Sequence, residues 1–137
     1  MDKSKTTSPK AATGIDFDQM QTLGDVARYQ ARERPDQLAL VFEGRETTYA
    51  EFNRHTNQVA NALIAAGLTK GQRIAYLGKN SDHYFELMFG ALKAGVVIAP
   101  IGWRLAPPEV AYIAGDSEAA MLFVGPEVAD QAAAIAP

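Results

Sequence analysis

From residue 49 onward, segments with helical periodicity alternate with short apolar segments, and this order is what most narrows the possible folds. The apolar segments, residues 73–77, 96–101 and 119–124, contain almost no polar side chains. Strands of this kind are typical of parallel sheets that are covered by helices on both faces. The sequence therefore predicts an α/β fold with a parallel sheet and right-handed helical crossovers.

Local signals place the ends of these helices. Residues 48–51, Thr-Tyr-Ala-Glu, form a capping box that predicts a helix starting at Thr48. Gly67 is placed to end that helix, and Gly95 to end the next one, which begins at a cap on Asn80 or Ser81. Prolines open two further helices, at residues 107–108 and at residue 126, and we expect the last helix to run over 128–136.

The segment before residue 49 predicts one helix and one hairpin. Thr22 is the expected N-cap of the helix, which Pro35 ends. Residues 37–48 have the pattern of a β-hairpin, with a turn over residues 43–46 and a short return strand over 45–48. Residues 1–19 are polar and predict a flexible leader. Residues 20–137 are then the folded part, and a sheet of three strands would leave both edges open, so we expect the chain to be the front part of a longer protein.

Composition excludes several classes of function. The net charge is −3, which argues against nucleic acid as the main partner. The absence of cysteine excludes disulfides, thiolate nucleophiles and cysteine metal sites, and is compatible with a reducing cytosol. No apolar run approaches the roughly 20 residues of a membrane span. We expect a cytoplasmic protein, and leave open a peripheral contact with a membrane and a homodimer.

Two near-matches to functional motifs have ordinary structural interpretations. Residues 78–80, Gly-Lys-Asn, follow a strand and precede a helix, but they lack the spacing of a phosphate-binding loop and indicate a capped turn. His83 and Glu86 offer only two of the three or four ligands that a metal needs. His55 is spaced to pair with Glu51 on a helix face. We therefore predict no metal site and no catalytic residue.

One loop does carry suitable chemistry for a ligand. Gly102, Trp103 and Arg104 follow the strand at 96–101, and open α/β sheets bind ligands at the carboxyl ends of their strands. An indole can stack on a base, and a guanidinium can grip a phosphate. The alternative is that Trp103 only fills the gap between this strand and the following helix.

Four segments resemble the adenylate-forming, AMP-binding enzymes. They are TTYAEFNRHTNQVANALIAAGLTKGQRI (47–74), ALKAGVVIAP (91–100), GWRLAPPEV (102–110) and DSEAAMLFV (116–124). The third is similar to the N-W-R-L-S-P-x-E-L stretch of acyl-CoA ligases, with Gly102 in place of the usual Asn and Ala106 in place of the usual Ser or Thr. The resemblance covers residues 22–137.

The resemblance implies the first part of the large domain of such an enzyme, with a partial flavodoxin-like parallel sheet, flanking helices and an N-terminal hairpin. It implies a parent that uses ATP and Mg²⁺ to activate a medium- or long-chain fatty acid as an acyl-adenylate and transfers it to coenzyme A. Gly102, Trp103 and Arg104 would contact the nucleotide end of coenzyme A. No residue here matches the family's phosphate loop, acyl pocket or catalytic lysine, so we expect those parts in the remainder of the polypeptide and no activity from this chain alone. An aryl-acid ligase, another adenylation domain and a stand-alone α/β binding module remain the alternatives.

Overall fold

The computed structural model describes residues 15–135. Its elements follow in chain order, with two short 3₁₀ turns (η1 and η2) among them: η1 Phe17–Gln19, α1 Gly24–Glu33, β1 Leu38–Phe42, β2 Arg45–Thr48, α2 Tyr49–Ala65, β3 Arg73–Leu77, α3 Asp82–Ala94, β4 Val97–Ile101, α4 Pro107–Asp116, β5 Ala119–Val124, η2 Pro126–Val128 and α5 Ala129–Ala133.

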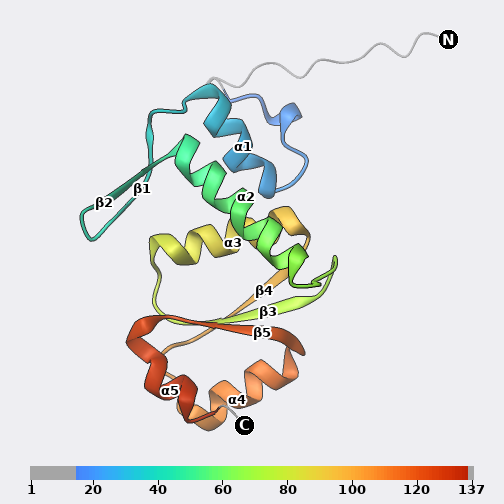
Figure 1. Cartoon of the computed structure of the whole chain (residues 1–137), viewed down its shortest axis with the longest axis vertical. Coiled ribbons are helices and arrows are strands. Elements are labelled where there is room, and N and C mark those ends of the chain that lie inside the picture. The colour runs from blue at the N-terminus through green and yellow to red at the C-terminus, as the bar shows by residue number, and fades with distance from the viewer. Residues whose placement is uncertain (1–14, 136–137) are drawn as a thin grey trace, which may run out of the picture.

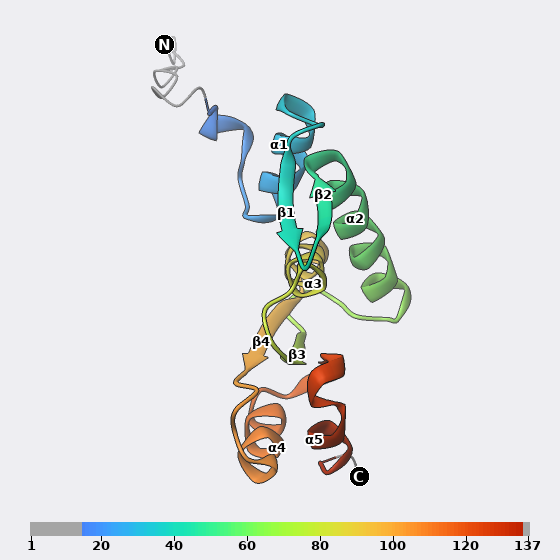
Figure 2. The ribbon, with the colours of Figure 1, turned by 90° about the vertical axis from the view of Figure 1, so that its left-hand side faces the viewer.

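Strands β3, β4 and β5 form one parallel sheet in the order β4-β3-β5. Helices α2 and α3 lie on one side of this sheet, and α4 and α5 lie on the other (Figure 1). The side view in Figure 2 shows the same layers, with α1 and the β1–β2 hairpin beyond α3 at the end distant from α4. This order is the beginning of a flavodoxin-like sheet, so the predicted α/β fold with a hairpin is confirmed.

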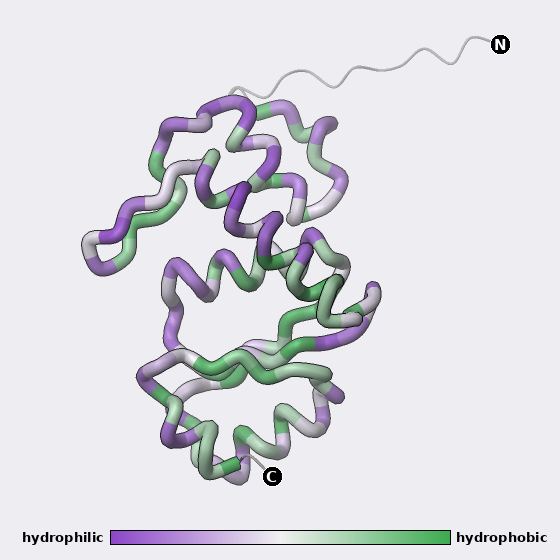
Figure 3. Tube along the Cα trace, viewed as in Figure 1, coloured by the Kyte–Doolittle hydropathy of each residue, from purple (hydrophilic) through white to green (hydrophobic). Residues whose placement is uncertain are grey.

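Only the central strand is covered on both faces as the apolar pattern predicts. Ile74, Ala75 and Leu77 of β3 have no exposed surface. On the edge strands, Val97 is 50% exposed and Leu122 is 37% exposed. Figure 3 nevertheless shows that hydrophobic colouring predominates in the sheet. The prediction that helices cover both faces therefore holds for β3. On β4 and β5, some apolar side chains stay partly exposed among the described residues.

The helix boundaries follow the predicted capping signals. The Thr48 hydroxyl accepts the Glu51 amide at 3.3 Å, and the Glu51 carboxylate accepts the Thr48 amide at 2.9 Å, which is the predicted capping box. These bonds lower the pKa of Glu51. Ser81, one of the two expected caps, accepts the amide of Tyr84 at 3.1 Å. Gly95 ends α3 with φ +72°, a left-handed conformation that glycine adopts without steric cost.

The hairpin is antiparallel, with Phe42 opposite Arg45. Its two-residue turn has positive φ at both Glu43 (49°) and Gly44 (79°), as the tightest hairpin turns require. The Arg45 guanidinium then donates two hydrogen bonds of 2.9 Å to the carboxylate of Asp82, at the start of α3. This bidentate ion pair fastens the hairpin to the helix layer.

The start of α1 corrects one prediction. Thr22 is not the N-cap: the helix begins at Gly24, after Leu23, and no side chain caps it. The Thr22 hydroxyl instead donates to the Asp25 carboxylate at 3.0 Å, because that carboxylate also accepts the Thr22 amide at 2.9 Å and draws the hydroxyl towards itself. Together with the Arg28 guanidinium, these donors lower the pKa of Asp25 to about 2.

The two ends of the described region also differ from the expected elements. Of the helix expected over 128–136, the last residue lies outside the described residues, Val128 belongs to η2, and only Ala129–Ala133 form the helix α5. The predicted leader, residues 1–19, lies mostly outside the described residues. Of its described part, residues 17–19 form η1, and the Asp16 amide donates to the Tyr29 hydroxyl of α1 at 2.8 Å. Among the described residues, none of the helices has the length and apolar character needed to cross a membrane.

Candidate functional site

Three loops meet at the carboxyl edge of the sheet, because parallel strands end on the same side. Gly78 and Lys79 follow β3, residues 102–104 follow β4, and residues 125–127 follow β5. From β3 the chain passes to α3 on one face, whereas from β5 it passes to η2 and α5 on the other face (Figure 1). A reversal of this kind between neighbouring strands opens a crevice in which α/β sheets bind ligands.

Trp103 is flanked by two cations from different loops. The Lys79 ammonium lies 4.5 Å from the centroid of the indole, and the Arg104 guanidinium carbon lies 4.7 Å from it. Both distances are within the range of a cation–π interaction. The indole also packs against a buried cluster beneath the sheet, which consists of Ala75, Leu77, Ile101, Val110 and Val128. Trp103 therefore packs in the gap behind β4, as the packing interpretation predicts. Its indole also lies in contact with both cations, so the three side chains are neighbours.

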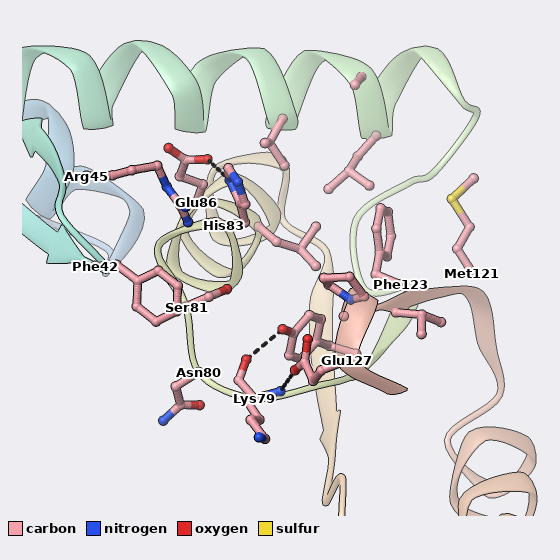
Figure 4. Close-up of a pocket in the computed structure, with 18 of the residues that line it drawn as sticks. Phe42, Arg45, Lys79, Asn80, Ser81, His83, Glu86, Met121, Phe123 and Glu127 are labelled. Carbon is pink, nitrogen blue, oxygen red and sulfur yellow. Dashed lines mark hydrogen bonds and ion pairs between the residues drawn. The ribbon is translucent and has the colours of Figure 1, made fainter. Parts of the chain in front are cut away.

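The backbone of Lys79 is held in place from both sides. Its amide donates to a carboxylate oxygen of Glu127 at 2.6 Å, and its carbonyl accepts the Tyr76 hydroxyl at 2.8 Å. Figure 4 shows Lys79 and Glu127 joined in this way. The hydrogen bond from the Lys79 amide lowers the pKa of Glu127, while burial raises the pKa of Tyr76. Gly78 is required here because a Cβ at this position would lie 2.6 Å from the Tyr76 hydroxyl.

A cavity of about 1030 Å³ opens beside this loop, between β5 and the helix layer. Figure 4 shows part of its lining, with Phe123 and Met121 from β5 and the His83–Glu86 pair from α3. Lys79 and Glu127 also line the cavity. Gly102, Trp103 and Arg104 do not, so the predicted site residues lie outside it and adjoin it through Lys79.

Sequence reasoning missed Lys79 and Glu127 as members of this site. The Gly-Lys-Asn segment was interpreted as a capped turn, and the cap on Ser81 confirms that interpretation. The available signal for Lys79 was its position directly after a strand of the same sheet as 96–101. For Glu127 no signal existed, because its carboxylate reaches Lys79 only through the folded loop after β5.

The two histidines, His55 and His83, both contact the carboxylate of Glu86. His55 Nδ1 lies 2.6 Å from one oxygen of Glu86, and His83 Nδ1 lies 3.2 Å from the other. The expected pairing of His55 with Glu51 is wrong: Glu51 is engaged by the capping box, whereas Glu86 faces His55 from α3. In residues 15–135 there is no group of three or more His, Asp and Glu side chains that could hold a metal ion.

Comparison with known proteins connects this arrangement with a family. The family model described as AMP-binding enzyme matches residues 27–137. The chain is 46% identical over 109 residues to the fatty acid–[acyl-carrier-protein] ligase ScoC of Streptomyces coeruleorubidus. This alignment covers 80% of this chain and 21% of that protein. It is 40% identical over 116 residues to a feruloyl-CoA synthase of an Amycolatopsis species, covering 85% of this chain and 24% of that protein. This chain thus spans less than a quarter of the length of these relatives.

Solved structures agree with the sequence matches. The N-terminal domain of FACL13 from Mycobacterium tuberculosis superposes with a TM-score of 0.81 and is 37% identical, over 85% of this chain and 30% of that one. A fatty acyl CoA synthetase from the same organism gives a TM-score of 0.81 at 38% identity, over 86% of this chain and 24% of that one. The chain belongs to the family of AMP-binding enzymes, and it matches the N-terminal part of that family's acyl ligases.

Proposed function

We propose that the chain is the N-terminal part of an ATP-dependent ligase that activates a fatty acid and transfers it to the thiol of coenzyme A. In this reaction the carboxylate attacks the α-phosphorus of ATP, giving an acyl-adenylate and pyrophosphate. The thiol then attacks the acyl carbonyl, and AMP leaves. A fatty acid is supported by relatives named as fatty-acid ligases, including the long-chain-fatty-acid–CoA ligase FadD13 of Mycobacterium tuberculosis, which is 38% identical over 108 residues.

Within this ligase, we assign Gly102, Trp103 and Arg104 to the nucleotide end of coenzyme A. The observation that carries the assignment is the indole of Trp103 with a cation at 4.5 Å and another at 4.7 Å, at the carboxyl edge of the sheet. An aromatic face next to two cations suits an adenine ring and its phosphates. Gly102 leaves the approach open, since a Cβ there would meet nothing closer than 3.5 Å, at Leu105. Lys79 joins the site as a second phosphate partner.

The described residues do not fit the Mg²⁺ that such a ligase uses. Magnesium is usually bound through one or two carboxylates together with substrate phosphates. In residues 15–135 no group of three or more His, Asp and Glu side chains comes together, and the Glu127 carboxylate next to Lys79 already accepts the Lys79 amide. We therefore place the Mg²⁺ and the chemistry on ATP in the remainder of the proposed enzyme. In this proposal the residues of the present chain bind and orient, and they exchange no proton or bond with the substrate.

A second candidate substrate class is supported by a specific comparison. The 40% identity to feruloyl-CoA synthase is close to the 38% identity to the long-chain ligase, so an aryl acid is the main alternative to a fatty acid. The 46% identity to ScoC makes an acyl carrier protein the alternative thiol. A stand-alone binding module remains the alternative to any ligase. Assay of the whole enzyme with a fatty acid and with ferulate, each with both thiols, separates these candidates.

The coenzyme A assignment can be tested in this chain directly, because Trp103 is its only tryptophan. Titration with coenzyme A should change the Trp103 emission in a saturable way. Pantetheine, which lacks the nucleotide, should have no such effect. In the whole enzyme, Arg104→Gln should raise the KM for coenzyme A severalfold and leave the KM for ATP within about twofold. Equal responses to coenzyme A and pantetheine, together with unchanged KM values, would leave the loop a packing element only.

A further inference from the structure

We propose a second, separate binding site: an open cavity of about 560 Å³ between α1, α2 and the carboxyl end of α3 that takes a small anion bearing a phosphate group. The cavity lies at the amino edge of the sheet, since Lys70 precedes β3 and Gly95 precedes β4. The Trp103 site lies at the opposite edge. The proposal therefore does not depend on the assignment of Trp103.

Three cations from three different parts of the chain line this cavity. Arg28 comes from α1, Lys70 from the loop before β3, and Lys93 from α3. The single carboxylate in the lining, that of Asp25, is already bound by the Arg28 guanidinium at 2.8 Å and by the Thr22 amide at 2.9 Å. Neither lysine takes part in an ion pair within residues 15–135. The cavity therefore has an excess of positive charge and one neutralised acid.

Lys93 also orients the amide groups of the lining. Its ammonium donates to Asn53 Oδ1 at 2.6 Å, to Asn57 Oδ1 at 2.7 Å and to the Thr56 hydroxyl at 2.8 Å. Since both carboxamide oxygens accept from the lysine, the NH₂ group is the remaining end of each asparagine. In the described part of the chain neither NH₂ group has an acceptor. Two neutral donors thus accompany the cations, and an anion is the ligand that this set would recognise.

The stems of the two lysines pack closely against glycines. A Cβ on Gly24 would come within 3.3 Å of Lys93 Cγ, and a Cβ on Gly95 would come within 3.2 Å of Lys70 Cγ. A side chain at Gly24 would therefore require a shift of a few tenths of an ångström, which would disturb the hydrogen bonds of Lys93 to Asn53, Thr56 and Asn57. Lys93 and Arg28, which their hydrogen bonds already hold in place, lose less side-chain entropy when an anion binds.

The donors favour phosphate over a carboxylate. A phosphate group carries close to two negative charges at neutral pH and offers three strong acceptor oxygens, whereas a carboxylate has one charge and two oxygens. The volume exceeds that of a single phosphate, so both free inorganic phosphates and the monoester of a nucleotide are sources of the same chemistry. Burial and the charge of Arg28 lower the pKa of Lys93 to about 8. A bound anion opposes both causes, so binding near pH 8 should take up protons.

The test is calorimetric titration of the 137-residue chain with inorganic phosphate, pyrophosphate or AMP, at pH 8 and constant ionic strength. We expect saturable binding that Arg28→Gln and Lys70→Gln each weaken at least fivefold. Arg32→Gln removes the same charge from an exposed position on the same helix, outside the cavity, and should change the affinity less than twofold.

Two readouts identify the ligand and the role of Lys93. Binding of pyrophosphate or phosphate supports a site for free anions, and binding of AMP alone supports a site for a nucleotide monoester. Repeating the titration in buffers of different ionisation enthalpy should show proton uptake, which Lys93→Met should abolish. The proposal is overturned if none of the three anions binds. It is also overturned if Arg32→Gln weakens binding as much as Arg28→Gln does.

Discussion

Lys79 meets Trp103 because the two residues occupy equivalent places after two paired strands. Leu77, the last residue of β3, lies opposite Ile101, the last residue of β4. Each strand is followed by one glycine and then by Lys79 or Trp103, so the parallel register brings the ammonium to 4.5 Å from the indole. The contact therefore depends on the register of the sheet as well as on the two side chains.

Replacement of Lys79 tests whether this contact serves a ligand. Lys79→Gln should weaken coenzyme A binding about three- to tenfold, since it removes one phosphate partner and a cation–π contact worth about 0.5–1 kcal/mol at exposed sites. The Trp103 emission of the 137-residue chain measures the affinity. Arg32→Gln, which removes one positive charge far from this loop, is the matched control. Equal affinity in both variants would remove Lys79 from the proposed site.

Gly90→Ala should destabilise the crossing of α2 and α3. A Cβ at this position would overlap the Val59 side chain and lie 3.1 Å from the Thr56 carbonyl, so the helices would have to separate. Overpacking of this kind costs about 1–3 kcal/mol in the free energy of unfolding. Urea denaturation measures the change. Gly115→Ala in α4 is the control, because nothing lies within 4 Å of its Cβ, and it should be neutral or stabilising.

Asp82→Asn should reduce the loss of folding stability that the chain undergoes as the pH falls towards 3. The Arg45 guanidinium holds the pKa of the buried Asp82 carboxyl below its usual value. A lowered folded pKa means that the carboxylate contributes stability above the ordinary aspartate pKa of about 3.9, and that this contribution is lost as the pH falls. The melting temperature of Asp82→Asn should therefore lie below that of the natural chain at pH 7 and approach it at pH 3. A difference that is the same at both pH values would contradict the ion pair, and Arg45→Gln should reproduce the loss.

Lys93→Met should change stability in the opposite pH range. The folded pKa of Lys93 is about 8, below the ordinary lysine value, because the ammonium is partly buried and lies near Arg28. Between pH 8 and about 10.4 the unfolded chain binds more protons at this lysine, so the natural chain should gain stability from this group as the pH rises. Denaturant titrations at pH 7, 8, 9 and 10 should show a steeper rise for the natural chain than for Lys93→Met. Parallel curves would contradict the lowered pKa.

The 137-residue chain should form no acyl-adenylate. The described residues supply neither a metal-binding cluster nor a match to the family's phosphate loop, which are the parts expected to hold ATP for attack and to offset the charge that develops on it. Incubation with ATP, Mg²⁺ and either palmitate or ferulate should release no pyrophosphate above the protein-free rate. The matched positive control is a whole ligase of the family under the same conditions. Steady pyrophosphate release by the purified chain would refute the expectation.

The sequence predicted most of the fold because its signals act over short distances. The Thr48–Glu51 box, the Ser81 cap and the left-handed Gly95 each involve residues within one helical turn, and all three are confirmed. Thr22 failed as a cap because Asp25, three residues on, captured both its amide and its hydroxyl. Motif spacing does not show which of two such local bonds is the stronger.

The site was less predictable, since its contacts join distant segments. Trp103 and Arg104 are predicted from their place at a strand end and from the family resemblance, and their part in binding stays a prediction. Lys79 joins them only through the register of β3 and β4, and Glu127 only through the loop after β5. The pairing of His55 with Glu86 similarly depends on how α2 crosses α3, which a helical periodicity alone does not specify.

The alternation of side chains along β5 has a practical consequence for handling the protein. Met121 and Phe123 turn towards the helix layer, while Leu122 and Val124 are more than a third exposed on the other face, and in residues 15–135 no strand pairs with the outer side of β5. Unpaired edges with apolar side chains invite intermolecular strand addition and aggregation. Solubility in concentrated preparations should thus depend on this edge. Leu122→Lys would place a charge on it and should reduce aggregation.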